Sequence, residues 1–504
     1  MSYKTTFCTY FCSFTMNATI IGSGIAGLAS SIHLARKGYQ VQIIEQAPSF
    51  GGKLNTIILG NYRFDSGPSL FTMPHFVTEL LDPDLVQKFQ YFKLPVLCNY
   101  FYPDGSQFHA SSQIETFIDE AAHFFDEPKS KIQRFLNHSK RIYDITSPVF
   151  LENSLHRLST YTAPTGIKGI ANLWRLDMFR TMNRALESQF SNPKIIQLFN
   201  RYATYNGSNP YKAPATLHVI PHLEFHYGAY LPKTGMRDIA EILYEQALRL
   251  GVQFEFNSRV NRLHVENQSS KPRISRVITE EGKEFKSDIV VANVDIKIVY
   301  QKLLQKSLPP KIKNAENSSS ALIFYWGIKQ KFPELDVHNI FFSNDYREEF
   351  DAIFHRKTIQ KDPTVYINIT SKLVGSDAPE YGENWFVMIN VPHNSGQDWK
   401  ELVGIAKEKI LQKLSKLLNV QVSDLIETEA VLDPITIESN TGSDKGSLYG
   451  SSSNHRMSAF FRQANFSKEY DNLYFCGGSV HPGGGIPLCL LGAKIVNKLI
   501  PEVH

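Results

Sequence analysis

The sequence predicts an α/β fold, organised around a parallel sheet whose first unit binds a dinucleotide. Three observations support this prediction. An apolar run over residues 18–21 has the character of a strand and leads directly into the glycine-rich turn 22–27. Residues 28–35 continue as a helix, and a second strand-like run over 40–44 ends at Glu45. Strand, glycine turn, helix, strand and acid in this order are the pattern of a Rossmann-like unit.

The glycine turn has the spacing that lets a backbone approach a pyrophosphate closely. Glycine permits the tight turn and leaves room for the phosphates. The helix that follows directs its free N–H groups and the positive end of its dipole at them. Glu45 is placed to accept hydrogen bonds from an adenosine ribose. The expected binding residues of this unit are Gly22, Ser23, Gly24, Ala26, Gly27 and Glu45.

Length and composition set the outer bounds of the prediction. A chain of 504 residues is too long for one simple core and indicates two or three domains. The net charge of +4 is small for this length, so we expect no nucleic-acid partner. The sequence has no run of 18 apolar residues, so no membrane-spanning helix is expected.

The five cysteines and the N-terminal segment bear on where the protein works. The cysteines are odd in number and scattered, which argues against a disulfide framework and for a reducing, cytoplasmic compartment. Met16 stands directly before the first strand, and residues 1–15 lack the long apolar core of a signal peptide. We therefore expect residues 1–15 to be a disordered or wrongly assigned extension, with Met16 as the true start.

The rest of the chain alternates between strand-like and helical segments. Residues 112–201 carry apolar positions at three- and four-residue spacing and are expected to be largely helical. Further helices are expected from about residue 236 to residue 249, over 398–418 and over 488–499. Strands are expected over 62–65, 251–256, 275–279, 288–293 and 472–475, with a second sheet that contains 319–328 and 384–391.

These elements predict a discontinuous domain organisation. The dinucleotide-binding domain is expected to comprise residues 16–90, 230–300 and 440–504. The inserted segments 91–229 and 301–439 are expected to form an α+β domain that binds the substrate and docks on a membrane.

A second glycine cluster stands before the last helix. Glycines at 477, 478 and 483–485 allow a flat cofactor to lie against the backbone, and the helix that begins near Ile486 would direct its positive end at that cofactor. A glycine-rich turn without a ligand is the alternative, and the N-terminal fingerprint favours the cofactor. The expected binding residues here are Gly477, Gly478, Gly485, Ile486 and Pro487.

Several blocks beyond these two resemble one enzyme family. They are Gly51-Gly52-Lys53, residues 63–69 (Arg-Phe-Asp-Ser-Gly-Pro-Ser), residues 203–216, residues 230–236 (Tyr-Leu-Pro-Lys-Thr-Gly-Met) and residues 477–487. Together they make the chain after Met16 similar to FAD-dependent carotenoid desaturases of the phytoene-desaturase type. The form Gly-Gly-Ser-Val-His-Pro at 477–482 is most similar to the 1-hydroxycarotenoid 3,4-desaturase branch.

The resemblance implies a Rossmann-like FAD-binding domain of the glutathione-reductase or amine-oxidase type. It adds Gly52, Lys53, Pro68, Ser69 and Val260 to the expected cofactor-binding residues, with Val260 at the end of a strand. It also implies that FAD accepts a hydride from a saturated carbon beside the polyene while the neighbouring carbon loses a proton. The resemblance assigns no general base and no metal, and we name no catalytic residue.

The resemblance also implies partners. The substrate is a carotenoid, which dissolves in membranes, so the protein is expected to bind peripherally to a membrane surface. The segment 173–180, with Trp174, Phe179 and Arg180, mixes aromatic and basic residues at helical spacing and suits an interfacial helix, although a core-facing helix is the commoner alternative. No second dinucleotide fingerprint occurs, so oxygen or a membrane quinone is the expected electron acceptor.

Three smaller features have competing interpretations. His218, His222 and His226 fall four residues apart, as metal ligands on a helix would, but Pro221 is expected to interrupt a helix there, so a structural or substrate-lining role is preferred. Arg63 and Asp65 are expected to be a structural pair near the flavin domain. Thr234 stands where the family commonly has glycine, and it would narrow that loop if the loop lay beside the flavin.

The sequence leaves three alternatives to the desaturase of a hydroxylated carotenoid. The first is a phytoene desaturase. The second is a carotenoid isomerase or a retinol-saturase-like flavoprotein. The third is a flavin-free prenyl-lipid escort protein, against which Glu45 and the complete glycine sets argue.

Overall fold

A five-stranded parallel sheet forms the base of the molecule in the computed structural model, which describes residues 16–172, 175–267, 271–455, 458 and 462–503. Its order is β19-β13-β1-β2-β9, and every neighbouring pair is parallel. The strands are β1 (Asn17–Ile21), β2 (Gln40–Ile44), β9 (Gln253–Glu255), β13 (Ile289–Ala292) and β19 (Leu473–Phe475). All five were expected from the sequence, and they come from three distant parts of the chain. The expected extension 1–15 lies outside the described residues.

Helices cover this sheet and carry the two glycine turns. α1 (Ile25–Arg36) begins directly after Gly24 and packs against α11 (Asp238–Arg249) and α18 (Ile486–Leu499). α18 begins at Ile486, within two residues of the expected start, and Pro487 is tolerated in its first turn, where the missing N–H has no partner to lose.

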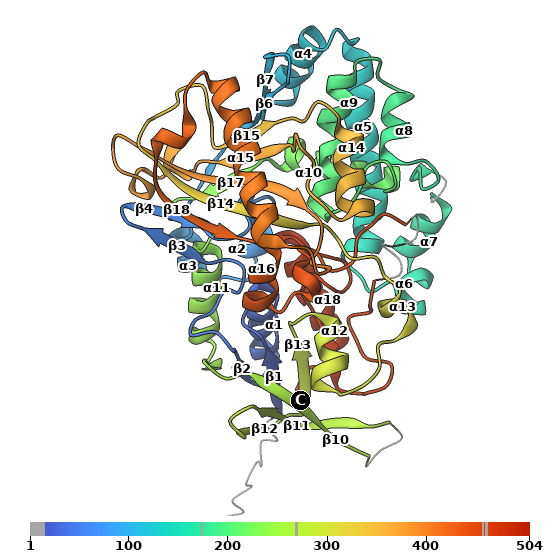
Figure 1. Cartoon of the computed structure of the whole chain (residues 1–504). Coiled ribbons are helices and arrows are strands. Elements are labelled where there is room, and N and C mark those ends of the chain that lie inside the picture. Colours follow the sequence, from blue (N-terminus) through green and yellow to red (C-terminus); the bar gives the residue numbers. More distant parts are fainter. Residues whose placement is uncertain (1–15, 173–174, 268–270, 456–457, 459–461, 504) are drawn as a thin grey trace, which may run out of the picture.

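A small antiparallel sheet lies at the lower end of the molecule in Figure 1. It consists of β10 (Val260–Glu266), β11 (Arg273–Thr279) and β12 (Glu284–Lys286). The structure corrects one expectation here, because Val260 begins a strand and does not end one.

A second, seven-stranded sheet lies above the first in Figure 1. Its order is β18 (Ile426–Leu432), β14 (Ser320–Ile328), β17 (Glu383–Val391), β16 (Val365–Asn368), β15 (His338–Phe341), β6 (Val96–Phe101) and β7 (Gln107–Ser111). The expected strands 319–328 and 384–391 are its central pair, β14 and β17. Two-stranded pairs join β3 (Thr56–Leu59) to β4 (Tyr62–Asp65) and β5 (Tyr91–Lys93) to β8 (Tyr230–Pro232).

The two faces of the seven-stranded sheet have different neighbours. α15 (Trp399–Leu418) covers one face, where Ile410 and Leu414 join one hydrophobic cluster with Phe324 and Trp326 of β14. The alternate residues of β14 face the other way, and Ile323 among them lines a large cavity. Because side chains alternate along a strand, the sheet separates a packed core from the cavity.

The described part of residues 112–201 is largely helical, as expected, and extends from the top of Figure 1 down its right-hand side. The helices are α4 (Ile114–Phe124), α5 (Lys129–Thr146), α6 (Leu158–Thr162), α7 (Pro164–Ala171), α8 (Met182–Glu187) and α9 (Pro193–Asn200). Other α-helices of the described residues are α2 (His75–Thr78), α3 (Pro83–Lys88), α10 (Val219–Tyr227), α12 (Ile296–Ile298), α13 (Pro310–Lys313), α14 (Tyr346–Asp351) and α16 (Pro434–Thr441). Within the described part of the chain, no helix has the length and apolar character needed to cross a bilayer.

The expected interfacial helix over 173–180 is wrong for the part that the structure describes. Trp174 lies outside the described residues, and 175–180 contain no α-helix. Asp177 has a φ of +50°, which breaks a right-handed helix, and its carboxylate accepts from Arg180 Nε at 2.9 Å. Phe179 is nevertheless 76% exposed.

Candidate functional site

A single cavity of about 1450 Å³ runs from the carboxyl ends of β1 and β2 to the open face of the seven-stranded sheet. Ligands of α/β sheets bind at these strand ends. The volume exceeds the roughly 300–1000 Å³ of common ligand pockets. It is lined by turns of the first sheet and by apolar residues of the second, so it has room for a dinucleotide and a second, apolar ligand.

The N-terminal glycine turn is packed too tightly for side chains. Gly22 has a φ of +94°, and a Cβ there would lie 2.9 Å from the carbonyl oxygen of Asn293. A Cβ on Gly27 would lie 2.1 Å from the carbonyl oxygen of Gly22. Asn293 Nδ2 donates to the same oxygen of Gly22 at 3.3 Å. The glycines therefore let the start of α1 approach the ends of β1 and β13.

Glu45 holds this turn from the end of β2. Its Oε2 accepts from both the backbone N and the Oγ of Ser23, each at 2.7 Å, and its Oε1 accepts from Ala47 N at 2.9 Å. The side chain is 8% exposed and lines the cavity. Glu45 thus positions the turn, and its expected contact with a ribose stays a prediction.

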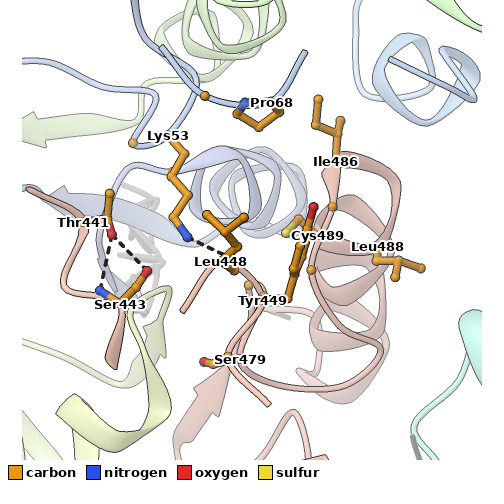
Figure 2. A pocket seen from close by; sticks show the side chains of 18 of the residues that line it. Lys53, Pro68, Thr441, Ser443, Leu448, Tyr449, Ser479, Ile486, Leu488 and Cys489 are labelled. Carbon is orange, nitrogen blue, oxygen red and sulfur yellow. Dashed lines mark hydrogen bonds between the residues drawn. The ribbon is translucent and has the colours of Figure 1, made fainter. Parts of the chain in front are cut away.

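The C-terminal glycine cluster forms the opposite wall. Gly477 has a φ of +98°, and a Cβ there would lie 2.7 Å from Asn293 Oδ1. A Cβ on Gly484 would lie 2.8 Å from the ring of Tyr449, whereas one on Gly485 would meet nothing within 4 Å. Asn293 therefore links both glycine turns. Figure 2 shows the N-terminal end of α18, with Ile486, Leu488 and Cys489, beside Tyr449.

Two cations lie in the cavity wall, of which Arg462 is buried and Lys53 is half-buried. Lys53 Nζ donates to the carbonyl oxygen of Leu448 at 3.1 Å (Figure 2), and Arg462 Nη1 donates to that of Gly478 at 3.1 Å. Burial lowers the pKa of Lys53, and it lowers the pKa of Arg462 to about 10. In the described residues, neither side chain has a carboxylate within ion-pair distance. Buried charges are normally paired, so this wall is suited to an anionic group.

The residues present therefore fit FAD. Glycine turns without room for side chains, the N-terminus of α18 and two unpaired cations face one cavity. The expected site residues that line it are Gly22, Gly24, Ala26, Glu45, Gly52, Lys53, Pro68, Ser69, Val260, Gly477, Gly478, Gly485, Ile486 and Pro487. The other two, Ser23 and Gly27, support the turn from behind it. That these residues contact the flavin remains a prediction.

Sequence reasoning missed Asn293, Tyr449 and Arg462. Asn293 had a signal, because it follows the buried strand β13 at the edge of the sheet where ligands bind. Tyr449 and Arg462 lie in irregular segments whose local sequence gives no such signal.

A second missed group is a buried polar cluster on the substrate side of the cavity. Arg201 donates to Tyr100 Oη at 2.7 Å, to Tyr205 Oη at 2.8 Å and to Glu224 Oε2 at 3.2 Å. Tyr202 also donates to Glu224 Oε2, at 2.6 Å. The side chains of Arg201 and Glu224 are 6% and 3% exposed. The charges of Arg201 and Glu224 compensate each other, and hydrogen bonds with the hydroxyl groups of Tyr100, Tyr202 and Tyr205 stabilise them further.

The side chains of His218 and His222 take part in packing contacts, and His226 stacks on His222. Pro221 does not interrupt α10, contrary to the expectation, because it lies in the first turn of that helix. His222 stacks on His226 with ring centroids 4.6 Å apart, and His218 packs against Phe135. Within the described ranges, no group of three or more His, Cys, Asp or Glu side chains is arranged to hold a metal.

Arg63 and Asp65 form the expected pair, with Nη2 and Oδ1 3.0 Å apart. Asp65 also accepts from Met236 N at 3.0 Å, and a Cβ on Gly235 would lie 2.3 Å from the guanidinium nitrogens of Arg63. Thr234 is exposed and does not line the cavity, so it does not narrow a flavin site.

Comparisons with known proteins agree with this geometry. The family model of flavin-containing amine oxidoreductases matches residues 25–500. The chain is 49% identical over 490 residues to the 1-hydroxycarotenoid 3,4-desaturase of Flavobacterium sp. (strain P99-3), covering 97% of this chain and 99% of that protein. It is 31% identical over 500 residues to the 4,4'-diapolycopene oxygenase of Methylomonas sp, covering 96% and 98%. A crystal structure of an oxidoreductase from Methanosarcina mazei matches with a TM-score of 0.64 at 13% identity, covering 96% of this chain and 100% of that one.

Proposed function

The chain belongs to the family of flavin-containing amine oxidoreductases and is an FAD-dependent oxidoreductase, and from this premise we propose that it desaturates the 3,4 bond of a 1-hydroxylated carotenoid. The observation that carries the proposal is the one continuous cavity. It joins the glycine turns to an apolar wall that includes Ile323, Phe386 and Met388 of the seven-stranded sheet. The full-length similarity to a 1-hydroxycarotenoid 3,4-desaturase supports the substrate class.

The division of labour in the reaction follows from the cavity. FAD, when bound, supplies the hydride acceptor. The apolar wall excludes water and binds the polyene, and the glycine turns let the substrate and the cofactor share one space. Lys53 and Arg462 place positive charge in the part of the cavity wall that would face the anionic groups of FAD. Oxygen or a membrane quinone is the proposed final electron acceptor.

Product spectra test the substrate assignment. The FAD-loaded protein is incubated on liposomes with a 1-hydroxylated acyclic carotenoid or with phytoene, in air. We expect a red shift of the product absorption with the hydroxylated substrate, because the polyene becomes longer by one double bond. A shift with phytoene instead would make the protein a phytoene desaturase, and no shift with either would favour isomerase or saturase chemistry.

We also propose that the protein docks on membranes through the exposed apolar side chains of Leu158, Ile167 and Phe179. Leu158 is 84%, Phe179 76% and Ile167 58% exposed, which is unusual for large apolar side chains so close in the sequence. Leu158 belongs to α6 and Ile167 to α7, at the right-hand side of Figure 1. Apolar side chains that enter the lipid interface would hold the cavity near its substrate.

A triple variant tests this docking surface. Replacing Leu158, Ile167 and Phe179 by serine is expected to weaken binding to liposomes by about tenfold or more, because each lost apolar side chain contributes roughly 1.5–3 kcal/mol on burial. Flotation of protein with liposomes measures the bound fraction. The matched control replaces Ile58, Ile405 and Ile435, which are also exposed, and should bind as the unchanged protein does. Equal binding by all three proteins would refute the proposal.

A further inference from the structure

Three side chains form a hydrogen-bonded chain on the cavity wall. Ser69 Oγ lies 2.8 Å from Tyr366 Oη, and Tyr366 Oη lies 2.7 Å from His338 Nδ1. Ser69 follows Pro68 in the turn expected to contact the flavin, Tyr366 lies on β16, and His338 begins β15. All three line the cavity, and Ser69 and Tyr366 are partly exposed within it.

The amide of Asn368 favours one direction for this chain. Its Nδ2 donates to the carbonyl oxygen of Val337 at 3.0 Å and lies 3.3 Å from His338 Nδ1. An amide nitrogen can only donate, which favours His338 Nδ1 as an acceptor. The proton of the neutral ring is then on the buried Nε2, which has no recorded partner among the described residues. Tyr366 must then donate to His338, and Ser69 must donate to Tyr366. The Ser69 hydroxyl group at the cavity end of the chain then uses its proton in the bond to Tyr366, so it can only accept a hydrogen bond from a ligand.

The chain is neutral near neutral pH, so it does not act as a charged group. Burial, with a contribution from the charge of Arg201, lowers the pKa of His338 to about 3. Burial also raises the pKa of Tyr366. A proton taken up at Ser69 would have to end on an imidazole that resists it. The arrangement therefore fits a hydrogen-bond acceptor for a neutral donor and does not fit a general base.

Ser69 lines the cavity, and Tyr366 is the one recorded hydrogen-bond partner of its hydroxyl group among the described residues. Within the part of the chain that the structure describes, no other side chain or backbone group is recorded as donating to it. Ile340, Phe386 and Met388 line the same side of the cavity. Once an apolar ligand fills the cavity, this acceptor costs free energy unless the ligand donates to it. The Arg201 cluster offers no comparable acceptor to a ligand, because the carboxylate of Glu224 already accepts from Arg201, Tyr202 and Tyr205.

We propose that the Ser69–Tyr366–His338 chain accepts a hydrogen bond from the hydroxyl group of the carotenoid substrate and thereby fixes which carbon bond meets the flavin. This inference rests on the proposed function. An oxygen on C1 lies roughly 3–5 Å from C3 and C4, given carbon–carbon bonds of ~1.5 Å. A group that binds this oxygen must therefore lie beside the flavin, and Ser69 is in the turn expected there.

Binding measurements on the FAD-loaded protein test the inference without turnover. The probes are a 1-hydroxylated carotenoid, its 1-methoxy ether and the same carotenoid lacking the oxygen, each titrated while tryptophan fluorescence quenching is recorded. The unchanged protein should bind the alcohol about tenfold more tightly than the other two, because the ether accepts hydrogen bonds but cannot donate one. Equal affinity for all three probes, or equal affinity for the alcohol and the ether, would overturn the inference.

Variants then assign the preference to the chain. Tyr366→Phe removes the acceptor of the Ser69 proton, so Ser69 can donate to the oxygen of the alcohol and of the ether alike, and the preference for the alcohol over the ether should fall to about one. Tyr102→Phe is the matched control, because Tyr102 is buried on the same sheet region, outside the cavity, and donates to Lys194 O at 3.2 Å. An unchanged tenfold preference in Tyr366→Phe would refute the role of the chain.

These outcomes separate the inference from the proposed function. Tight, selective binding of the alcohol without any desaturated product would leave the inference intact and refute the proposed function. Desaturation of the alcohol without any binding preference among the three probes would support the function and refute the inference. The comparison of probes on the unchanged protein needs no variant, so it decides the inference even where Tyr366→Phe fails to fold.

Discussion

Replacing Gly27 by alanine is expected to abolish retention of FAD. A Cβ at this position would lie 2.1 Å from the carbonyl oxygen of Gly22, so α1 would have to move away from the glycine turn. The turn and the N-terminus of α1 are the elements expected to hold the pyrophosphate. Even about 1.4 kcal/mol of strain in the bound state weakens binding tenfold. The ratio of flavin to protein absorption after purification measures the loss.

Gly404 provides a matched control for this prediction. It is an exposed glycine within α15, and a Cβ there would meet nothing within 4 Å. Gly404→Ala should keep its FAD and gain about 0.5–1 kcal/mol of stability, because alanine is the better helix former. Far-ultraviolet circular dichroism of both variants shows whether the fold survives. Normal FAD content in a folded Gly27→Ala protein would contradict the assignment of the glycine turn.

Replacing Arg201 by methionine is expected to lower the free energy of unfolding by about 3–5 kcal/mol, because it leaves the Glu224 carboxylate buried without its cation. The midpoint of urea unfolding, followed by circular dichroism, measures the change. The double variant Arg201→Met with Glu224→Leu should recover much of the loss, since an apolar pair of similar volume leaves no charge uncompensated.

A surface ion pair provides the contrast. Lys140 and Asp144 lie four residues apart on α5, and their side chains are 51% and 52% exposed. Lys140→Met should cost about 0.5 kcal/mol or less, because solvent screens such a pair. Equal losses in Lys140→Met and Arg201→Met would show that the buried cluster does not stabilise this part of the fold.

The parts of the fold that the sequence predicts correctly are those specified locally. The first strand, the glycine turn, α1 and β2 follow one another within 30 residues, and each step has its own signal in the chain. The apolar run 319–328 and the alternating pattern of 398–418 likewise predict β14 and α15. The error at 173–180 arose because Asp177 adopts a left-handed conformation that residue spacing does not reveal.

The substrate side of the site could not be predicted in the same way. Ser69 and Tyr366 are 297 residues apart, and the polarity of their hydrogen bond depends on the orientation of Asn368. Arg201, Tyr100 and Glu224 come from a short helical turn, a strand and α10, and none of them belongs to a recognisable motif. Only the pairing of distant strands brings these groups together, and one sequence contains no record of that pairing.

The most direct test of the central claim is a single reaction cycle without oxygen. The FAD-loaded protein is mixed with one equivalent of a 1-hydroxylated carotenoid or of phytoene under anaerobic conditions, and the absorption of flavin and polyene is recorded together. The account predicts that the hydroxylated substrate alone bleaches the flavin, with an equal amount of red-shifted product. Bleaching by phytoene with none by the hydroxylated carotenoid, or a red-shifted product with the flavin still oxidised, would contradict it.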